Sequence, residues 1–464
     1  MPDASSTPTT IAIIGAGCTG ALLAINLLKL PQNRHKKILL IDKFARMGRG
    51  LAYRTWDDNH VLNVPAGNMS ALPDDPQHFV NFCQTIDPAF SAGSFVSRRL
   101  YGDYLEHTLA AAALHDTARL QRIAHEAIAV VPDAGNGAGV RIALDGAEAV
   151  VADAVVLALG HLPPLDRIPA LQACAGAFYV NNPWDARAYD DLRMDDSVLL
   201  VGTGHTAVDV LFTLTNLTDQ RKVYLVSRRG LLSHPHRPQT HAPALREFPA
   251  YLDTVPATAR HYFRAVREQV QREAARGVDW RDIIAPLRPH TPAIWQRLPI
   301  AERSRFLRHA WTYWDIHRHR LSPSAYVRLQ DMIARGQVEI IAGRIQEAVQ
   351  VDDGVSVGIR ARHSEKILQR RVKKIISCTG PNYDIARTEH RLFRQLLRDG
   401  LIRQDALKIG LDVNADYAVV SANAEPSTAI FYVGPMLRAQ YLEAIGVPEL
   451  RVHANRLARQ LSGV

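Results

Sequence analysis

Residues 10–28 constrain the fold of this chain more than any other stretch. They begin with an apolar run at 11–14, which predicts a short buried strand, and end with an apolar run at 21–28, which predicts a helix. Between the two runs the glycines are spaced G-x-G-x-x-G: Gly15, Gly17 and Gly20. This spacing permits a tight turn, the approach of a pyrophosphate to the backbone, and close packing of helix on strand. The stretch therefore predicts a dinucleotide site at the helix N-terminus, where unpaired N–H groups favour phosphate.

An acidic residue follows this motif at the expected distance. The next apolar run, Ile38–Ile41, predicts a second strand, and Asp42 comes directly after it. A carboxylate about 20 residues beyond the glycines binds a ribose hydroxyl in such units. We expect the surrounding contacts to come from three further residues: Ala16, Thr19 and Lys43. The alternative is a tight strand-to-helix turn that holds no ligand.

Length and cysteine content limit the class of protein. The chain has 464 residues, which predicts at least two domains. Its four cysteines include no close pair, which favours a reducing cytoplasm and argues against a disulfide or zinc framework and against a disulfide reductase. No apolar run of about 18 residues predicts a membrane helix. Residues 1–6 lack the basic region of a signal peptide.

The net charge of +9 predicts anionic partners. The arginines are nevertheless spread along the chain, with no dense basic run and no recognisable nucleic-acid module. Phosphorylated cofactors and a small anionic substrate therefore explain the charge better than nucleic acid does.

The chain between the motifs alternates loops, helices and strands. Residues 48–70 are rich in Gly, Asn and Pro, which predicts a long functional loop, and helices are predicted at 76–84 and 99–113. Three strand runs then lead to Gly160: 128–131, 139–143 and 154–160. Three similar runs lead to Gly380 near the other end: 345–351, 355–360 and 372–380. We expect a strand meander that is used twice.

A second dinucleotide motif lies between these meanders. After a predicted strand at 197–201, the turn reads G-x-G-x-x-A and contains Gly202, Gly204 and Thr206. The next predicted strand, 222–227, ends in two arginines, Arg228 and Arg229, instead of an acid. Arginine at this position suits the 2′-phosphate of NADPH and favours NADPH over NADH. Two solvated arginines are the alternative.

Residues 231–320 exceed what a dinucleotide unit requires, and we expect them to form a substrate or lid element. Amphipathic helices are predicted at 257–275 and 303–320, and the arginines of the second helix fit a solvated face or an anion site. The histidines stand among prolines with no carboxylate in a ligand pattern: His234, His236 and His241. We therefore interpret them as loop residues and predict no metal site.

Further motifs carry a resemblance to a known group of proteins. The long loop reads Gly48-x-Gly-x-Ala-Tyr53 and then His60-x-Leu-Asn-Val-Pro-Ala-x-x-Met69-Ser. Later motifs are Pro73-Asp74, Arg99-x-Tyr-Gly-Asp-Tyr104, Gly434-Pro-x-Leu-Arg438 and Val447-Pro-Glu-Leu-Arg451. Together with both dinucleotide motifs, they make the chain resemble, over nearly its whole length, the bacterial FAD/NAD(P)-binding flavoproteins. This group includes the FAD-dependent urate hydroxylases and the aspartate N-hydroxylating monooxygenases.

The resemblance implies an α/β fold with two Rossmann-like dinucleotide-binding domains of the three-layer ββα type, β-meanders and a helical insertion. It implies an FAD-binding domain made of residues 1–190 and 346–464. The NADPH-binding domain would span residues 191–345, with the insertion at 231–320.

The resemblance also assigns roles to residues. The first glycine motif and Asp42 would hold the ADP part of FAD, and the second motif with Arg228 would hold NADPH. Other cofactor contacts would be Tyr53, Asn63 and Met69 near the isoalloxazine, Gly160 and Gly380 after their strands, and Gly434 and Pro448 closing over the flavin. The catalytic candidates are His60, as a proton-transfer group or an orienting hydrogen bonder, and Asn63.

The implied chemistry takes place at the flavin. NADPH would reduce FAD, dioxygen would give a flavin C4a-hydroperoxide, and a small polar substrate would be hydroxylated at carbon, as in urate, or at an amine nitrogen. Baeyer–Villiger oxidation is disfavoured because the stretch from Phe178 to Trp184 lacks the histidine of that motif. The alternatives are an FAD-dependent NAD(P)H oxidoreductase with a non-oxygen acceptor and a non-catalytic flavin-bound sensor. The sequence predicts neither the substrate nor the oligomeric state.

Overall fold

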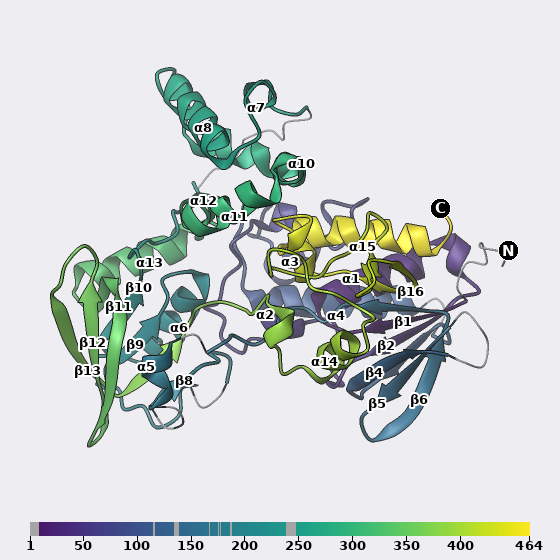
Figure 1. The fold of residues 1–464 in the computed structure, drawn as a ribbon, viewed down its shortest axis with the longest axis horizontal. Helices are drawn as coiled ribbons and strands as arrows, with labels where there is room; N and C mark the ends of the chain where they lie inside the picture. The colour runs from purple at the N-terminus through teal and green to yellow at the C-terminus, as the bar shows by residue number, and fades with distance from the viewer. Residues whose placement is uncertain are drawn as a thin grey trace.

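The computed structural model describes residues 9–114, 117–133, 139–166, 168–174, 176, 178–185, 188–237 and 247–464. Figure 1 shows two α/β units side by side, each built on its own sheet, with a group of helices projecting on one side. The predicted α/β class with two dinucleotide-binding units is confirmed. Among the described residues, no helix is both long and apolar enough to cross a membrane.

The first unit is built on a six-stranded sheet in which all neighbouring strands are parallel except β15 and β16. Its central strands are continuous Ile, Leu, Val and Ala runs, and they are buried because helices and a meander cover the sheet. In sheet order the strands are β15 (Ala418–Val420), β16 (Pro426–Tyr432), β7 (Ala154–Leu157), β1 (Thr10–Ile14), β2 (Lys37–Ile41) and β3 (Leu120–Ile123).

Helices from both ends of the chain cover this sheet. The helix of the first glycine motif, α1 (Cys18–Lys29), packs against α4 (Arg98–Leu114) and the C-terminal helix α15 (Val447–Leu461). Short elements complete the unit: α2 (Gly50–Tyr53), α3 (His78–Ile86), α14 (Arg391–Arg398), η1 (Pro31–Asn33), η2 (Ala66–Asn68), η5 (Ile385–Arg387) and η6 (Pro435–Ala439). The first unit is therefore built from two separate stretches of the chain.

A separate antiparallel meander belongs to the first unit: β4 (Ala127–Pro132), β5 (Val140–Leu144) and β6 (Ala147–Ala152). Gln395 of α14 bonds its edge, because its amide accepts from Val130 N–H at 2.9 Å and donates to the Val130 carbonyl at 3.0 Å. Tertiary hydrogen bonds thus join the second half of the chain to this meander.

The second unit is built on a seven-stranded sheet. In sheet order its strands are β13 (Ile367–Val372), β12 (Gly354–Ala361), β11 (Val338–Val351), β10 (Val223–Ser227), β9 (Val198–Val201), β14 (Lys374–Ser377) and β8 (Tyr179–Val180). The repeated meander is confirmed, but its strands pair within this second sheet. From the sequence, residues 346–377 and 179–180 are predicted to belong to the first unit. Strand pairing instead assigns both ranges to the second unit. The reason is β11, whose first part runs parallel to β10 and whose second part pairs antiparallel with β12.

The remaining helices are α5 (Pro169–Gln172) and α6 (His205–Thr215), which belong to the second unit, and the helices of the insertion. In chain order, the latter are α7 (Ala250–Asp253), α8 (Ala259–Ala274), α9 (Arg281–Ile284), η4 (Ala285–His290), α10 (Thr291–Arg297), α11 (Ile300–His309) and α12 (Trp311–Arg318), after which α13 (Pro323–Ala334) leads into β11. The helix predicted at 303–320 is thus two helices. Ala310, with φ −112°, ends α11, and Trp311 can then pack against Phe306 with ring centroids 6.2 Å apart.

Candidate dinucleotide sites and the cleft between them

The first glycine turn is tightly packed by backbone. Gly15 has φ +101°, and a Cβ on it would lie 2.4 Å from the Ala158 carbonyl oxygen. A Cβ on Gly20 would lie 1.9 Å from the Gly15 carbonyl oxygen. The N-terminus of α1 at Gly17 has no side-chain cap, so its N–H groups remain available to a phosphate. These features fit the pyrophosphate of FAD.

Asp42 is fixed beside this turn. Its carboxylate accepts from Ala16 N–H at 2.7 Å and from Phe44 N–H at 3.0 Å. A carboxylate has further lone pairs, so it still has capacity for a ribose hydroxyl. The loop residue Gly50 lies against Gly17, where an added Cβ would be 3.1 Å from the Gly50 Cα. The first turn is therefore enclosed by the chain that follows it.

The residues expected near the isoalloxazine differ in exposure. Met69 is buried, Tyr53 is half-buried, and burial raises the pKa of Tyr53 far above its usual value. The Tyr53 ring contacts the Tyr101 ring at 4.7 Å. Asn63 is half-buried, and its side-chain amide has no hydrogen-bond partner among the described residues. An amide in this condition is available to a ligand.

Other predicted contacts are distributed around the two turns. Thr19 is buried in α1, and Lys43 is exposed. Gly160 and Gly380 have φ +69° and +86°, with open space where a Cβ would stand. In the C-terminal segment, Gly434 precedes η6 and is buried, and Pro448 lies in the first turn of α15.

His60 lies in a hydrogen-bond network between the two units. The imidazole is 3% exposed, and its Nδ1 lies 2.7 Å from the Thr55 hydroxyl. Its Nε2 lies 2.8 Å from the Thr213 hydroxyl and 3.1 Å from the Asp209 carbonyl, both in α6. Both ring nitrogens are therefore engaged within the protein, an arrangement that suits an orienting group better than a proton-transfer group.

The second glycine turn repeats the packing of the first at one position and departs from it at another. Gly202 has φ +129°, and a Cβ on it would lie 2.5 Å from the Cys378 carbonyl oxygen, as at Gly15. Gly204 is exposed, with nothing within 4 Å of a Cβ position. The N-terminus of α6, where Thr206 stands, also lacks a side-chain cap. This turn is open to a ligand.

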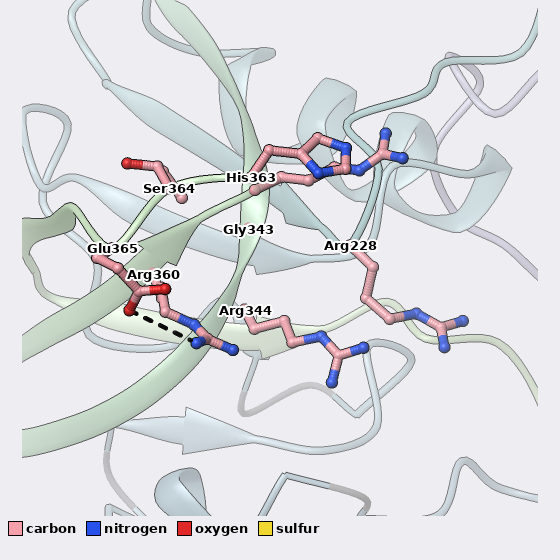
Figure 2. A pocket seen from close by; sticks show the side chains of 9 residues that line it. Arg228, Gly343, Arg344, Arg360, His363, Ser364 and Glu365 are labelled. Carbon is pink, nitrogen blue, oxygen red and sulfur yellow. Dashed lines mark ion pairs between the residues drawn. The ribbon is translucent and has the colours of Figure 1, made fainter.

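A basic pocket lies where β10 ends. It has a volume of about 420 Å³, and the residues with ionisable side chains in its lining are Arg228, Arg344, Arg360, Arg362, His363 and Glu365. Figure 2 shows the Arg228 and Arg344 side chains extending in the same direction, with Glu365 paired to Arg360 at 3.8 Å. Arg344 and Arg360 are direct cross-strand neighbours, a like-charge pair that an anion between them would stabilise. The structure thus places three further arginines beside Arg228: Arg344, Arg360 and Arg362. No sequence signal marks them, because each is a single arginine at or near the end of a predicted strand.

The insertion contacts the long loop of residues 48–70, which we call the flavin loop because flavin contacts are predicted in it, and the C-terminal segment of residues 434–451. His236 Nε2 donates to the Asn63 carbonyl at 3.0 Å. Trp295 Nε1 donates to the Ala439 carbonyl at 2.9 Å, and Arg318 pairs with buried Glu443 at 2.8 Å. The insertion, which is part of the second unit in sequence, is therefore bonded to the first.

An apolar cavity of about 650 Å³ lies among the insertion helices, with Trp280, Trp314 and His317 in its lining. His234 stacks near His317, with ring centroids 4.5 Å apart. His241 lies outside the described residues. Among the residues that are described, no group of three or more His, Cys, Asp or Glu could hold a metal ion.

Comparison with known proteins agrees with this fold. Residues 12–162 match a family model described as FAD-NAD(P)-binding, and no curated protein matches the sequence. L-Lysine 6-monooxygenase from Pseudomonas syringae superposes with a TM-score of 0.67 at 15% identity, covering 98% of this chain and 99% of the other. Ornithine hydroxylase from Pseudomonas aeruginosa gives 0.65 at 15% identity, with 99% of each chain covered. Thioredoxin reductase from Lactococcus lactis gives 0.53 at 10% identity, covering 98% and 97%.

These likenesses define the fold as that of flavoproteins with two dinucleotide-binding units. Within that class, the lysine 6-monooxygenase and the ornithine hydroxylase superpose better than the thioredoxin reductase.

Proposed function

We propose that this chain is an FAD-dependent, NADPH-using monooxygenase that hydroxylates a small polar substrate. One observation carries the proposal: the chain has two glycine turns in different surroundings. The first turn is enclosed and lies beside Asp42, whereas the second is open, and the strand that follows it leads to the Arg228 pocket. The first arrangement suits a cofactor that stays bound, and the second suits a phosphorylated cofactor that exchanges. Electrons would therefore pass from the second unit to the first.

The residues of the first unit fit FAD. The uncapped N-terminus of α1 would bind the pyrophosphate, and Asp42 would bind the ribose. When bound, FAD supplies reductive activation of dioxygen and transfer of one oxygen atom to the substrate. The amide of Asn63, free among the described side chains, would orient a polar group at the flavin edge, and His236 holds the Asn63 backbone in place.

The residues of the second unit fit NADPH. The 2′-phosphate would lie among Arg228, Arg344 and Arg360, where charge-assisted hydrogen bonds replace like-charge repulsion. NADH lacks this phosphate, so we propose a preference for NADPH.

Hydroxylation at an amine nitrogen is the form of the reaction that the fold likeness supports best. The similar structures include an ornithine hydroxylase, a lysine 6-monooxygenase and, at a TM-score of 0.63 and 14% identity, a cadaverine monooxygenase from Erwinia amylovora. Hydroxylation at carbon, as in urate, is the second form. All four cysteines are free, which supports the cytoplasm as the compartment and argues against a disulfide reductase.

Anaerobic and aerobic turnover of the purified flavin-loaded chain tests the proposal. We expect NADPH to reduce the flavin without oxygen, and a hydroxylated product, identified by its mass, to form only with oxygen and a substrate from a panel of amines, amino acids and urate. Rapid anaerobic electron transfer to a quinone or ferricyanide, with no hydroxylated product, would instead support the oxidoreductase alternative. A flavin that NADPH does not reduce would contradict both and support a sensor.

A further inference from the structure

Arg320 is a buried arginine with no ion pair. Its side chain follows α12 and is 6% exposed, and its Nε is enclosed and unpartnered. Its guanidinium makes no hydrogen bond or ion pair with any described residue; it lies near the Trp280 ring, 5.9 Å from Cζ to centroid, and is attracted at longer range by Asp279. An isolated buried charge is costly, so proteins retain such groups where a ligand or partner completes them.

The neighbouring charges do not satisfy Arg320. Burial, and next the nearby Arg318, lower its pKa to about 10, so the guanidinium stays charged at neutral pH. Each neighbouring arginine already has its own carboxylate: Arg281 has Asp279, Arg237 has Asp282 and Arg318 has Glu443. Among the described arginines of this cluster, Arg320 alone has no ion pair at contact distance, since Asp279, the carboxylate that attracts it, is already paired with Arg281.

His236 places a hydrogen-bond acceptor on the same side of the chain as the Arg320 guanidinium. Pro235 and Leu321 form a parallel bridge, so the flanking side chains of His236 and Arg320 leave from the face opposite to the bridged pair. The Nε2 of His236 donates to a carbonyl and so carries the proton, and burial lowers the pKa of His236 to about 3. The ring is neutral, and its buried Nδ1 is an acceptor with no partner in the described structure.

We propose that Arg320 and His236 form the recognition site for the substrate's anionic end. The guanidinium binds the anionic oxygens, and His236 Nδ1 accepts from an N–H next to them. This pattern fits an α-amino acid, with carboxylate and ammonium side by side, or an anionic ureide or purine ring. The inference rests on the proposed function, and it narrows the substrate class from small and polar to anionic with an adjacent N–H.

The site is adjacent to the flavin loop. His236 bonds the Asn63 carbonyl, and Arg318, two residues before Arg320, pairs with Glu443 of the segment expected to close over the flavin. A substrate held at Arg320 by its anionic end would therefore be anchored at the border of the insertion and the first unit. Because the guanidinium is already desolvated, little solvent has to be removed on binding, and the interaction discriminates strongly.

Binding measurements with matched probes test the proposal. L-Ornithine and 1,4-diaminobutane differ only in the carboxylate, and L-aspartate and urate represent the amino-acid and ring-anion sources. Thermal shift and perturbation of the bound-flavin spectrum report binding on the full chain. We expect at least one anionic probe to bind the natural protein at least tenfold more tightly than 1,4-diaminobutane, and R320M to abolish that difference. R320K should restore part of it.

Arg303 provides the matched control. Its guanidinium is half-buried in the same insertion but donates to the carbonyls of Trp295, Leu298 and Gln296 at 2.9–3.0 Å. R303M should lower the Tm and leave probe binding unchanged, whereas R320M should keep or raise the Tm. The inference is overturned if no anionic probe binds better than the diamine, or if R320M binds the probes as the natural protein does.

His236→Gln tests the second half of the site. Glutamine can still donate to the Asn63 carbonyl through Nε2, but its one acceptor, Oε1, belongs to that same amide and does not occupy the position of Nδ1 in the ring. We expect weaker binding of the favoured probe to this variant, and unchanged binding would remove His236 from the site. Probe binding through Arg320 without any hydroxylated product would contradict the proposed function and leave the anion site standing.

Discussion

The two dinucleotide turns share a backbone plan and differ in what surrounds them. In both, the first glycine lies against a strand-end carbonyl, 2.4 Å from an added Cβ at Gly15 and 2.5 Å at Gly202. The loop that contains Gly50 covers the first turn at Gly17, whereas Gly204 in the second turn faces open space. Under the proposed function, this difference in cover lets the first turn retain its cofactor and the second exchange it.

Gly20→Ala should produce the largest difference between the turns. The new Cβ would meet the Gly15 carbonyl oxygen, a backbone atom that cannot rotate away, at a cost of about 3 kcal/mol or more. We expect the purified variant to have little bound FAD and a lower Tm. Gly204→Ala, with no atom within 4 Å, is the matched control and should retain FAD. Equal FAD loss in both variants would contradict the distinction.

Arg228→Ala should produce the next largest effect, confined to the open turn. Loss of one charge-assisted bond to the 2′-phosphate should raise the KM for NADPH about 10- to 100-fold. The KM for NADH should hardly change, and FAD content should remain full. Arg394→Ala, an exposed arginine of the first unit that pairs with Glu389 at 2.8 Å, is the control. An unchanged ratio of the two KM values would place the 2′-phosphate elsewhere.

His60→Gln sharpens the comparison at the contact between the units. The variant loses at least one of the three hydrogen bonds of this buried ring, so we expect a loss of stability of about 1–3 kcal/mol, measured by denaturant unfolding. Turnover per bound flavin should change little. If His60 transfers a proton in the reaction, kcat should instead fall about 10²-fold or more.

His453 should produce the smallest effect, and only in acid. It lies in α15, where its Nδ1 is 2.9 Å from the Tyr417 hydroxyl, and burial lowers its pKa to about 4. The unfolded chain binds this proton near pH 6.5, so stability is full above that pH and declines as the pH falls towards 4. The loss at pH 5 should be on the order of 2 kcal/mol. His453→Gln should flatten the plot of Tm against pH, and an unchanged slope would assign the acid sensitivity to other groups.

Both turns could be predicted from the sequence because each depends on neighbouring residues. The glycine spacing, the acid after β2 and the arginine after β10 are local, and the structure places them as expected. The pairing of residues 346–377 could not be predicted, because alternation along a strand indicates which face is buried and not which strand lies beside it. β11 has two partners along its 14 residues, and only the folded sheet reveals where one gives way to the other.

Arg320 illustrates the same limit at the candidate site. Along the chain it is the end of an arginine-rich helix, which predicts a solvated face. Its burial results from the bridge between Pro235 and Leu321, two residues that are distant in sequence. The arginines at 344, 360 and 362 could not be predicted as site residues for the same reason, since the folded sheet brings them beside Arg228.

The ties between the insertion and the C-terminal segment bear on how such an enzyme can be re-engineered. Arg288 pairs with Glu449 and Arg318 with Glu443, so the insertion and the tail bury complementary charges against each other. Exchanging the insertion alone for that of a relative would leave buried Glu443 and half-buried Glu449 without these counter-ions, at a cost of several kcal/mol. Under the proposed function, an exchange intended to change substrate choice should therefore transplant residues 231–320 together with residues 434–451.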